Sequence, residues 1–189
     1  MTTPPMMRLF FAVDLSHFFK ERVGEFLHEL KKKTKGQQIR FSRQENLHIT
    51  LQFLPEVKSS VVEQLIASVT ESITGFESFN INLAKIVLFP NPYRPRVIVL
   101  DIEPQQIIKN LSLMIGQSIQ SIGLPIEEKS FRAHLTIGRI TNPQDVNLRL
   151  LPLQATPQFP ALIVDQVKLY RSEPQTNGSN YTELAVINF

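Results

Sequence analysis

The amino-acid sequence predicts an α+β protein made of two similar halves. Segments in which apolar and polar residues alternate, as in half-buried strands, are interleaved with three amphipathic helical patterns. One order of strand, aspartate, helix and polar strand occurs in both halves, which suggests two lobes related by a pseudo-twofold axis. No linker-like stretch separates the halves, so residues 1–189 are expected to form a single bilobed domain.

The first half begins with an apolar run, Arg8–Leu15, that is typical of a short buried strand. Ser16 is well placed to cap the helix that follows, and Gly36 to end it. Alternation then predicts a strand over Asn46–Leu54, where Pro55 is expected to end it. The other elements expected in this half are a strand at 39–42, a helix at about 60–73 and a strand at about 79–83.

The second half follows a loop, Phe89–Pro95, whose prolines cannot join a strand ladder. A strand is expected over 96–102 and a helix over about 105–122. Alternation predicts another strand over Phe131–Ile140. After a stretch at 141–160 without a clear pattern, strands at 161–171 and 181–189 are expected to pair around a turn at Asn177–Gly178.

Composition places the chain among ordinary soluble globular proteins, because 42% of its residues are hydrophobic and 20% are charged. No stretch approaches the roughly 20 apolar residues that a membrane helix needs. The apolar run near the N-terminus ends at Asp14 without a small-residue cleavage site, so we expect a strand rather than a signal peptide. The chain has no cysteine, which excludes disulfides, thiolate catalysis and zinc–thiolate sites and favours a reducing, cytoplasmic setting.

Positive charge is concentrated in one segment, although the formal net charge of the chain is only +3. Between Lys20 and Arg43, lysines and arginines clearly outnumber glutamates. Such a patch attracts a phosphate backbone or another polyanion. The lysines from Lys31 to Lys35 also suit the C-terminal end of a helix, where they interact favourably with its dipole. The sequence leaves both interpretations open.

The strongest signal is a short motif, His-x-Thr, that occurs once in each half. His48-Ile-Thr-Leu51 follows the strand that ends at Asp14, and His134-Leu-Thr-Ile137 follows the strand that ends at Asp101, at nearly equal spacing. Composition alone predicts about 0.2 such triplets in a chain of this length. Two of them in matching segments therefore indicate a duplicated functional unit.

Each motif is expected to present an imidazole and a hydroxyl on the polar face of its strand. Residues two apart in a strand share a face and lie about 6.5 Å apart. If the two lobes face one another, two imidazoles and two hydroxyls converge on one cleft; otherwise these are ordinary exposed faces of antiparallel sheets. The side chains expected on the two faces are His48, Thr50 and Gln52 in the first strand and Arg132, His134 and Thr136 in the second.

The segments Glu45–Leu54 and Phe131–Arg139 resemble the two HxTx signatures of the two-histidine (2H) phosphoesterases. The opening Arg8–Val13 and the closing Arg171-Ser172 and Tyr181 are similar to the branch called RNA 2′,3′-cyclic phosphodiesterases, also described as LigT-like or ThpR. The resemblance covers nearly the whole chain. It implies a bilobed α+β fold with two pseudo-twofold-related lobes of mainly antiparallel sheet, helices on the outside and the active site in the cleft between the lobes.

The resemblance also implies hydrolysis of an RNA 2′,3′-cyclic phosphate end to a 2′-phosphate. It suggests His48 as the acid that protonates the leaving oxygen and His134 as the base that activates water, an order that the sequence alone does not fix. Two imidazoles, one neutral and one protonated, can make both proton transfers, so neither a metal nor another cofactor is expected. The second motif departs mildly from the family, since many members have proline where Ala133 stands and an aliphatic residue or alanine where Gly138 stands.

Other side chains are candidates for binding the substrate. Thr50 and Thr136 would donate hydrogen bonds to non-bridging phosphate oxygens, where charge grows in the transition state. Arg132 is either a phosphate clamp or an ordinary surface arginine. A phenylalanine ring can stack on a base, although most phenylalanines are core residues. The candidate rings are Phe89, Phe10 and Phe11.

Three other functions are alternatives to this reaction. A metal hydrolase would use His48 and His134 as ligands, but no HExxH motif accompanies them. A non-catalytic RNA-binding module would explain the basic segment, but it leaves both His-Thr pairs unused. A 2H enzyme could also act on a small cyclic nucleotide or on a 2′-5′ RNA linkage. The expected partner is RNA with a 2′,3′-cyclic phosphate end, bound by a monomer without a membrane or an obligate protein partner.

Overall fold

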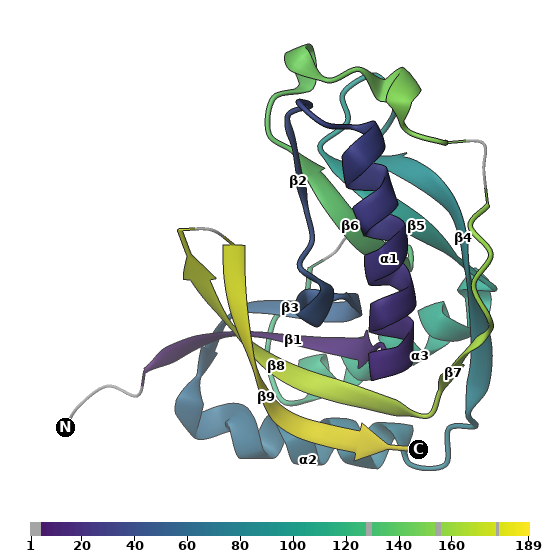
Figure 1. The fold of residues 1–189 in the computed structure, drawn as a ribbon. Coiled ribbons are helices and arrows are strands. Elements are labelled where there is room, and N and C mark those ends of the chain that lie inside the picture. The colour runs from purple at the N-terminus through teal and green to yellow at the C-terminus, as the bar shows by residue number, and fades with distance from the viewer. Residues whose placement is uncertain (1–4, 128–129, 154–155, 177) are drawn as a thin grey trace.

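The computed structural model describes residues 5–127, 130–153, 156–176 and 178–189. Its strands form a four-stranded sheet in the order β3-β1-β8-β9 and a five-stranded sheet in the order β2-β6-β5-β4-β7 (Figure 1). Neighbouring strands in both sheets are antiparallel, which confirms the predicted α+β class. The strands are β1 (Met6–Asp14), β2 (Ile39–Phe41), β3 (His48–Lys58), β4 (Phe79–Phe89), β5 (Val97–Glu103), β6 (His134–Ile140), β7 (Leu162–Val164), β8 (Gln166–Gln175) and β9 (Gly178–Asn188).

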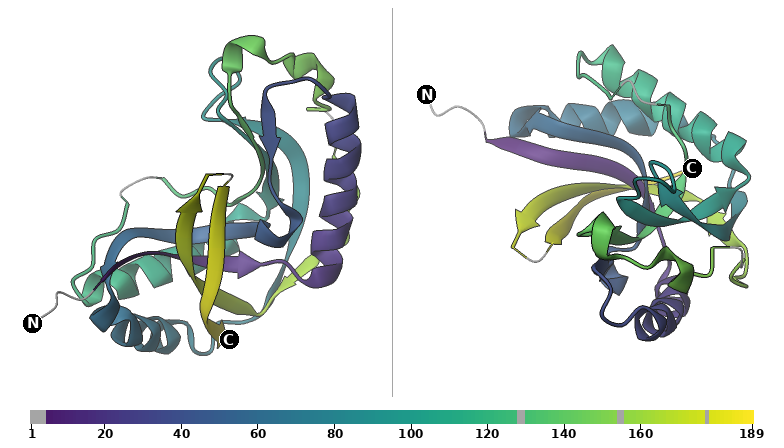
Figure 2. Two further views of the ribbon diagram at one scale, coloured as in Figure 1. Left: turned by 60° about the vertical axis from the view of Figure 1, so that its left-hand side comes forward. Right: turned by 90° about the horizontal axis from the view of Figure 1, so that it is seen from above.

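The long helices pack against the two sheets. Helix α1 (His17–Lys33) lies alongside the five-stranded sheet, whereas α2 (Val62–Ile73) and α3 (Gln105–Ser121) lie together against the four-stranded sheet (Figures 1 and 2). Because α1 follows β1 and α3 follows β5, each helix packs on the sheet to which its preceding strand does not belong. Because each of these two helices packs on the other sheet, the apolar faces of both sheets contribute to one continuous core.

The predicted ends of α1 follow local chemistry. The Ser16 side chain accepts a hydrogen bond from the Phe19 backbone N–H at 3.4 Å, which caps the helix N-terminus. The helix ends at Lys33, and Gly36 takes the left-handed conformation, with φ of +81°. The described part of the chain contains no helix that is long and apolar enough to cross a membrane.

Pro55 does not end its strand, contrary to the prediction. Strand β3 continues to Lys58. It is an edge strand, and its register with β1 shifts at this point, because Met7 pairs with Val57 but Leu9 pairs with Leu54. Pro55 therefore lies in a bulge, exposed at a sheet edge, where a missing N–H breaks no ladder hydrogen bond.

Other element boundaries also differ from the prediction. β4 extends to Phe89, and β6 begins at His134 rather than at Phe131. The backbone before His134 leaves the ladder because Ala133 bonds to a side chain of α3 instead of to β5. Two short 3₁₀ helices, Pro143–Asp145 and Leu148–Leu150, occupy the segment that had no prediction. The β8–β9 hairpin is confirmed, although Asn177 in its expected turn lies outside the described residues.

Candidate active site

The two His-x-Thr motifs occupy equivalent positions in the two sheets. His48 of β3 lies opposite Asp14, the last residue of β1. His134 of β6 likewise lies opposite Asp101 of β5. The repeat seen in the sequence is therefore a repeat of strand register.

A bulge follows the threonine in the first motif. Thr50 pairs with Ala12 and Gln52 pairs with the preceding residue, Phe11, so one extra residue is inserted into β3. The prediction that Gln52 shares the face of His48 was wrong for this reason. The Gln52 amide turns to α3, where it donates to the Ser112 carbonyl at 2.9 Å. Phe53 takes its place in the cleft.

The second motif has the same bulge. Thr136 pairs with Val99 and Gly138 with Ile98, which places the extra residue of β6 between them. This turns Arg139 onto the face that carries Thr136, and Arg139 lines the cleft. Strict alternation places Phe53 and Arg139 on the opposite faces of their strands, so neither was predicted from the sequence to line the site. Their equal offset from the two histidines is the signal that could have found them.

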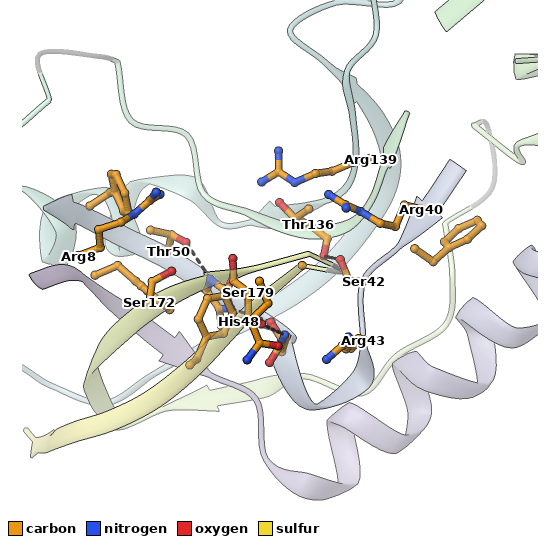
Figure 3. Close-up of a pocket in the computed structure, with 17 residues that line it drawn as sticks. Arg8, Arg40, Ser42, Arg43, His48, Thr50, Thr136, Arg139, Ser172 and Ser179 are labelled. Atoms are coloured by element: carbon orange, nitrogen blue, oxygen red, sulfur yellow. Dashed lines mark hydrogen bonds between the residues drawn. The ribbon is translucent and has the colours of Figure 1, made fainter. Parts of the chain in front are cut away.

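The cleft between these strands has a volume of about 560 Å³ (Figure 3). It brings together His48 and Thr50 from β3 with Thr136 from β6. His134 lies two residues before Thr136 on the same face of β6; it does not line the cleft itself, but its charge acts on the pKa of His48. Among the described residues, no carboxylate lines this cleft. The arginines that line it are Arg8, Arg40, Arg43 and Arg139.

Both imidazoles are held in the same tautomer. The Nδ1 atom of His48 lies 2.7 Å from the Asn46 carbonyl, and that of His134 lies 2.8 Å from the Arg132 carbonyl. A carbonyl only accepts, so each neutral ring carries its proton on Nδ1 and has its lone pair on Nε2. The Nε2 atom of His48 lies 3.0 Å from Thr50 Oγ1, which can donate to it.

Burial makes both histidines weak bases. It lowers the pKa of His48 to about 4, while the Asn46 carbonyl and the Asp14 charge act in the opposite direction. The rings of Phe10 and Tyr181, with centroids 4.7 Å and 5.2 Å from that of His48, exclude water from it. Desolvation also lowers the pKa of His134. Near pH 7 and without a ligand, both rings are therefore neutral.

The aspartate opposite His48 holds the turn that fixes this imidazole. Asp14 bonds Lys20 at 2.7 Å and Lys168 at 3.2 Å. Lys20 Nζ also donates to the Glu45 carbonyl at 3.2 Å. The next residue, Asn46, supplies the carbonyl that accepts from His48. An ion pair between β1 and α1 thus fixes the backbone beside the acceptor.

Asp101, the aspartate opposite His134, has an analogous role through its contact with a residue of α3. Asp101 binds Arg132 at 2.6 Å and accepts from Gln105 Nε2 at 3.1 Å. Gln105 also binds the backbone of Ala133, next to the Arg132 carbonyl that accepts from His134. In each motif, a helix residue bound to the aspartate therefore holds the backbone next to the carbonyl that orients the histidine.

Comparison with known proteins agrees with this geometry. A family model described as "LigT like Phosphoesterase" matches residues 13–99. A curated Archaeoglobus fulgidus protein named RNA 2′,3′-cyclic phosphodiesterase is 31% identical over 183 residues, which cover 95% of this chain and 99% of that protein. The chain belongs to the LigT-like phosphoesterase family.

A further relative of this LigT-like phosphoesterase bears the same name, and two solved structures share its fold. The Methanothermobacter thermautotrophicus RNA 2′,3′-cyclic phosphodiesterase is 29% identical over 95% of this chain and 97% of that protein. A solved Thermus thermophilus structure has a TM-score of 0.75 at 26% identity, covering 96% of this chain and 97% of that one. Escherichia coli LigT complexed with 3′-AMP has a TM-score of 0.78 at 24% identity, covering 96% and 97% of the two chains, and supports the shared fold.

The phenylalanines predicted to stack on a base lie in different parts of this LigT-like phosphoesterase. Phe11 is fully buried in the core, so the prediction that it stacks on a base was wrong. Phe10 is 3% exposed and lies between the rings of His48 and Tyr170. Phe89 lies outside the cleft wall, with its ring centroid 4.9 Å from that of His134.

The basic side chains that were candidates for phosphate binding have different surroundings in this LigT-like phosphoesterase. The Arg132 guanidinium is bound to Asp101 and lies over the Phe89 ring, and it does not line the cleft. Of the segment from Lys20 to Arg43, Lys20 is bound to Asp14, whereas Arg40 and Arg43 reach the cleft. The described residues contain no group of three or more His, Asp or Glu side chains that could hold a metal ion.

Proposed function

We propose that this phosphoesterase hydrolyses RNA 2′,3′-cyclic phosphate ends to 2′-phosphate ends, with His134 as the base and His48 as the acid. The observation that carries the proposal is the matched pair of histidines, each with its Nε2 lone pair left available by a backbone carbonyl on Nδ1. Relatives that align with nearly the whole chain are named for this reaction. Two imidazoles are sufficient for both proton transfers that the reaction needs.

The chemical step is a displacement at phosphorus. His134 Nε2 removes a proton from water, and the resulting hydroxide forms a new P–O bond. The bond from phosphorus to the ribose 3′ oxygen breaks, and His48 Nε2–H gives its proton to that oxygen. The products are a 2′-phosphate monoester and a 3′-hydroxyl, and each imidazole then exchanges one proton with solvent to return to its starting state.

Substrate charge is needed to protonate the acid. His48 is neutral in the free cleft because burial lowers its pKa to about 4. An anion within about 4–6 Å raises such a pKa by about 1–3 units, so a bound phosphate favours the protonated ring. Protonation also releases the Thr50 hydroxyl from donating to Nε2, and its proton can then bond a phosphate oxygen.

The other cleft residues suit the phosphate and the base. Thr136 lies across the cleft from Thr50, so the two hydroxyls can bond non-bridging oxygens where negative charge develops. Phe53 offers a ring to the cleft, which makes it a better stacking platform than Phe11. Arg132 would act mainly through Asp101 and Phe89, beside His134.

Incubation with an oligoribonucleotide that ends in a 2′,3′-cyclic phosphate tests the proposal, with the product assigned by phosphorus NMR. We expect a 2′-phosphate, formed equally well after exhaustive chelation. Activity that is lost on chelation and returns with zinc or manganese would favour the metal hydrolase. Binding without turnover would favour an RNA-binding module. A cyclic mononucleotide and a 2′-5′-linked dinucleotide, assayed in parallel, define the substrate class.

We further propose that the enzyme acts as a cytoplasmic monomer without a cofactor or an obligate protein partner. Sedimentation of the purified protein at assay concentration tests the monomer. Full activity of protein purified without added cofactor or partner tests the independence from both.

A further inference from the structure

The tip of the β8–β9 hairpin forms one wall of the cleft. Gln175, Gly178 and Ser179 line the cleft from this tip, together with Tyr181 farther along β9 (Figure 3). The Tyr181 ring packs in a T-shaped arrangement against His48, with the two ring centroids 5.2 Å apart. The hairpin therefore contacts the imidazole that serves as the acid in the proposed reaction.

A second contact joins the hairpin to the backbone that orients His48. The Asn46 side chain donates a hydrogen bond from Nδ2 to the Ser179 carbonyl at 3.0 Å. The backbone carbonyl of the same asparagine lies 2.7 Å from His48 Nδ1. Asn46 is the last residue of the short 3₁₀ helix before β3, and it is half-buried. One residue thus links the hairpin to the acceptor that fixes the tautomer of His48.

The Ser179 carbonyl is available for this bond because a proline lies across from it. Ser179 pairs with Pro174 of β8 in the antiparallel register. In such a ladder a carbonyl accepts from the N–H of the residue directly opposite, and proline has no N–H. Among the described strands, β9 is also at the edge of its sheet. The strand ladder therefore leaves this carbonyl to a donor from elsewhere, and Asn46 supplies that donor.

We propose that Asn46 is a positioning residue, whose side chain holds the acceptor of His48 in place by anchoring it to the β8–β9 hairpin. The 3₁₀ helix that ends at Asn46 has only three residues, so its backbone needs support from its neighbours. Lys20 of α1 holds the Glu45 carbonyl, and Ser179 of β9 holds the next residue. The inference rests on the proposed function in one respect, which is the role of His48 as the acid.

Replacement of Asn46 by leucine tests this role. Asn46→Leu removes the donor but keeps the backbone carbonyl and nearly the same side-chain size. We expect kcat on an RNA 2′,3′-cyclic phosphate end to fall about 10- to 100-fold, with a smaller change in KM. An aryl phosphodiester whose leaving oxygen needs no proton should lose much less activity, because it does not depend on the acid. In nitrogen NMR at pH 7, His48 should change from a single Nδ1–H tautomer to a mixture.

Asn180→Leu is the matched control. Asn180 follows Ser179 on the same hairpin, but it is exposed and lies outside the cleft wall. This variant should keep the wild-type tautomer of His48 and the wild-type rates on both substrates. Asn46→Ala repeats the comparison with a smaller side chain if circular dichroism shows that Asn46→Leu is misfolded.

Two kinetic results would overturn the positioning role. A raised KM with an unchanged His48 tautomer would show that Asn46 contacts the substrate directly. Equal losses of kcat on the cyclic phosphate and on the aryl phosphodiester would show general damage to the cleft.

The NMR measurement separates this inference from the proposed function, because it needs no turnover. If the wild type hydrolyses no cyclic phosphate, the proposed function fails. The link from the hairpin to His48 still stands if the Asn46 variant shows mixed tautomers and Asn180→Leu does not. A single Nδ1–H tautomer in both variants refutes the link.

Discussion

Gln105 holds both backbone groups of Ala133. Its Nε2 donates to the Ala133 carbonyl, and its Oε1 accepts from the Ala133 N–H, each at 2.9 Å. A proline at this position, as in many proteins that the second motif resembles, has no N–H to donate. Ala133 therefore gives this chain one more bond between α3 and the backbone that orients His134.

Replacement of this glutamine should impair orientation more than binding. We expect Gln105→Leu to lower kcat by about 10- to 100-fold with a smaller change in KM, since small displacements of a catalytic group have effects of this size. Nitrogen NMR of His134 should show the loss of a single Nδ1–H tautomer, a change that a purely structural role would not cause. Gln106→Leu is the matched control, because the exposed Gln106 side chain donates to Asn110 on the outer surface of α3. An unchanged tautomer would contradict the positioning role.

The two histidines should behave as a unit. His48→Ala or His134→Ala should each lower kcat by at least about 100-fold, and the double variant should lose much less than the product, because both transfers serve one displacement. An aryl phosphodiester whose leaving oxygen needs no proton should partly rescue the acid variant only. Rescue of His134→Ala instead of His48→Ala would reverse the assignment. His28→Ala, on the exposed face of α1, should have wild-type activity.

The pH profile of kcat/KM should peak on the acidic side of neutrality. The base must be neutral and the acid protonated, so activity is highest between the two pKa values of the free enzyme. Burial lowers one of them to about 4 and the other below its usual 6.5. In the pH profile of kcat, the bound phosphate should move both the acidic and the basic limb to higher pH. Steady-state kinetics on a cyclic mononucleotide measure both profiles. A kcat/KM optimum above pH 7 would exclude the lowered histidine pKa values as the cause of the profile.

The same buried ring should make the fold sensitive to acid. The pKa of His48 is about 4 in the folded state and close to 6.5 in the unfolded chain, so the unfolded chain binds the proton first. Stability is therefore lost as pH falls from about 6.5 to 4, by at most about 3 kcal/mol. Urea unfolding should show a shallower loss for His48→Gln than for the wild type. His28→Gln should have the wild-type slope, and an equal slope for His48→Gln would contradict the linkage.

Phe53 should affect binding of the base. Stacking of a base on an aromatic ring contributes about 1–3 kcal/mol, so Phe53→Leu should raise KM for a cyclic mononucleotide by about 10-fold. The control is Phe18→Leu, because Phe18 is 56% exposed on α1 and outside the cleft. A fall in kcat at constant KM would show instead that Phe53 acts on the chemical step.

Local sequence patterns were sufficient for most elements of the fold. Ser16 and Gly36 bracket α1 through capping and a left-handed backbone, which are local properties. The β8–β9 hairpin was predicted from short-range alternation and turn residues. Pro55 misled the prediction because its effect depends on whether β3 is an edge strand, which is a property of the sheet.

The sequence by itself determined the duplicated strand, aspartate, helix and His-x-Thr order, and with it the pair of candidate catalytic histidines. Only the tertiary structure decided that Phe53 and Arg139 face the cleft while Gln52 turns to α3. A single bulge reverses the face of every later residue in a strand, and a bulge is defined by the partner strand. The pairing of Arg40 in β2 with Arg139 in β6 has the same origin, since residues far apart in sequence become neighbours only through sheet register.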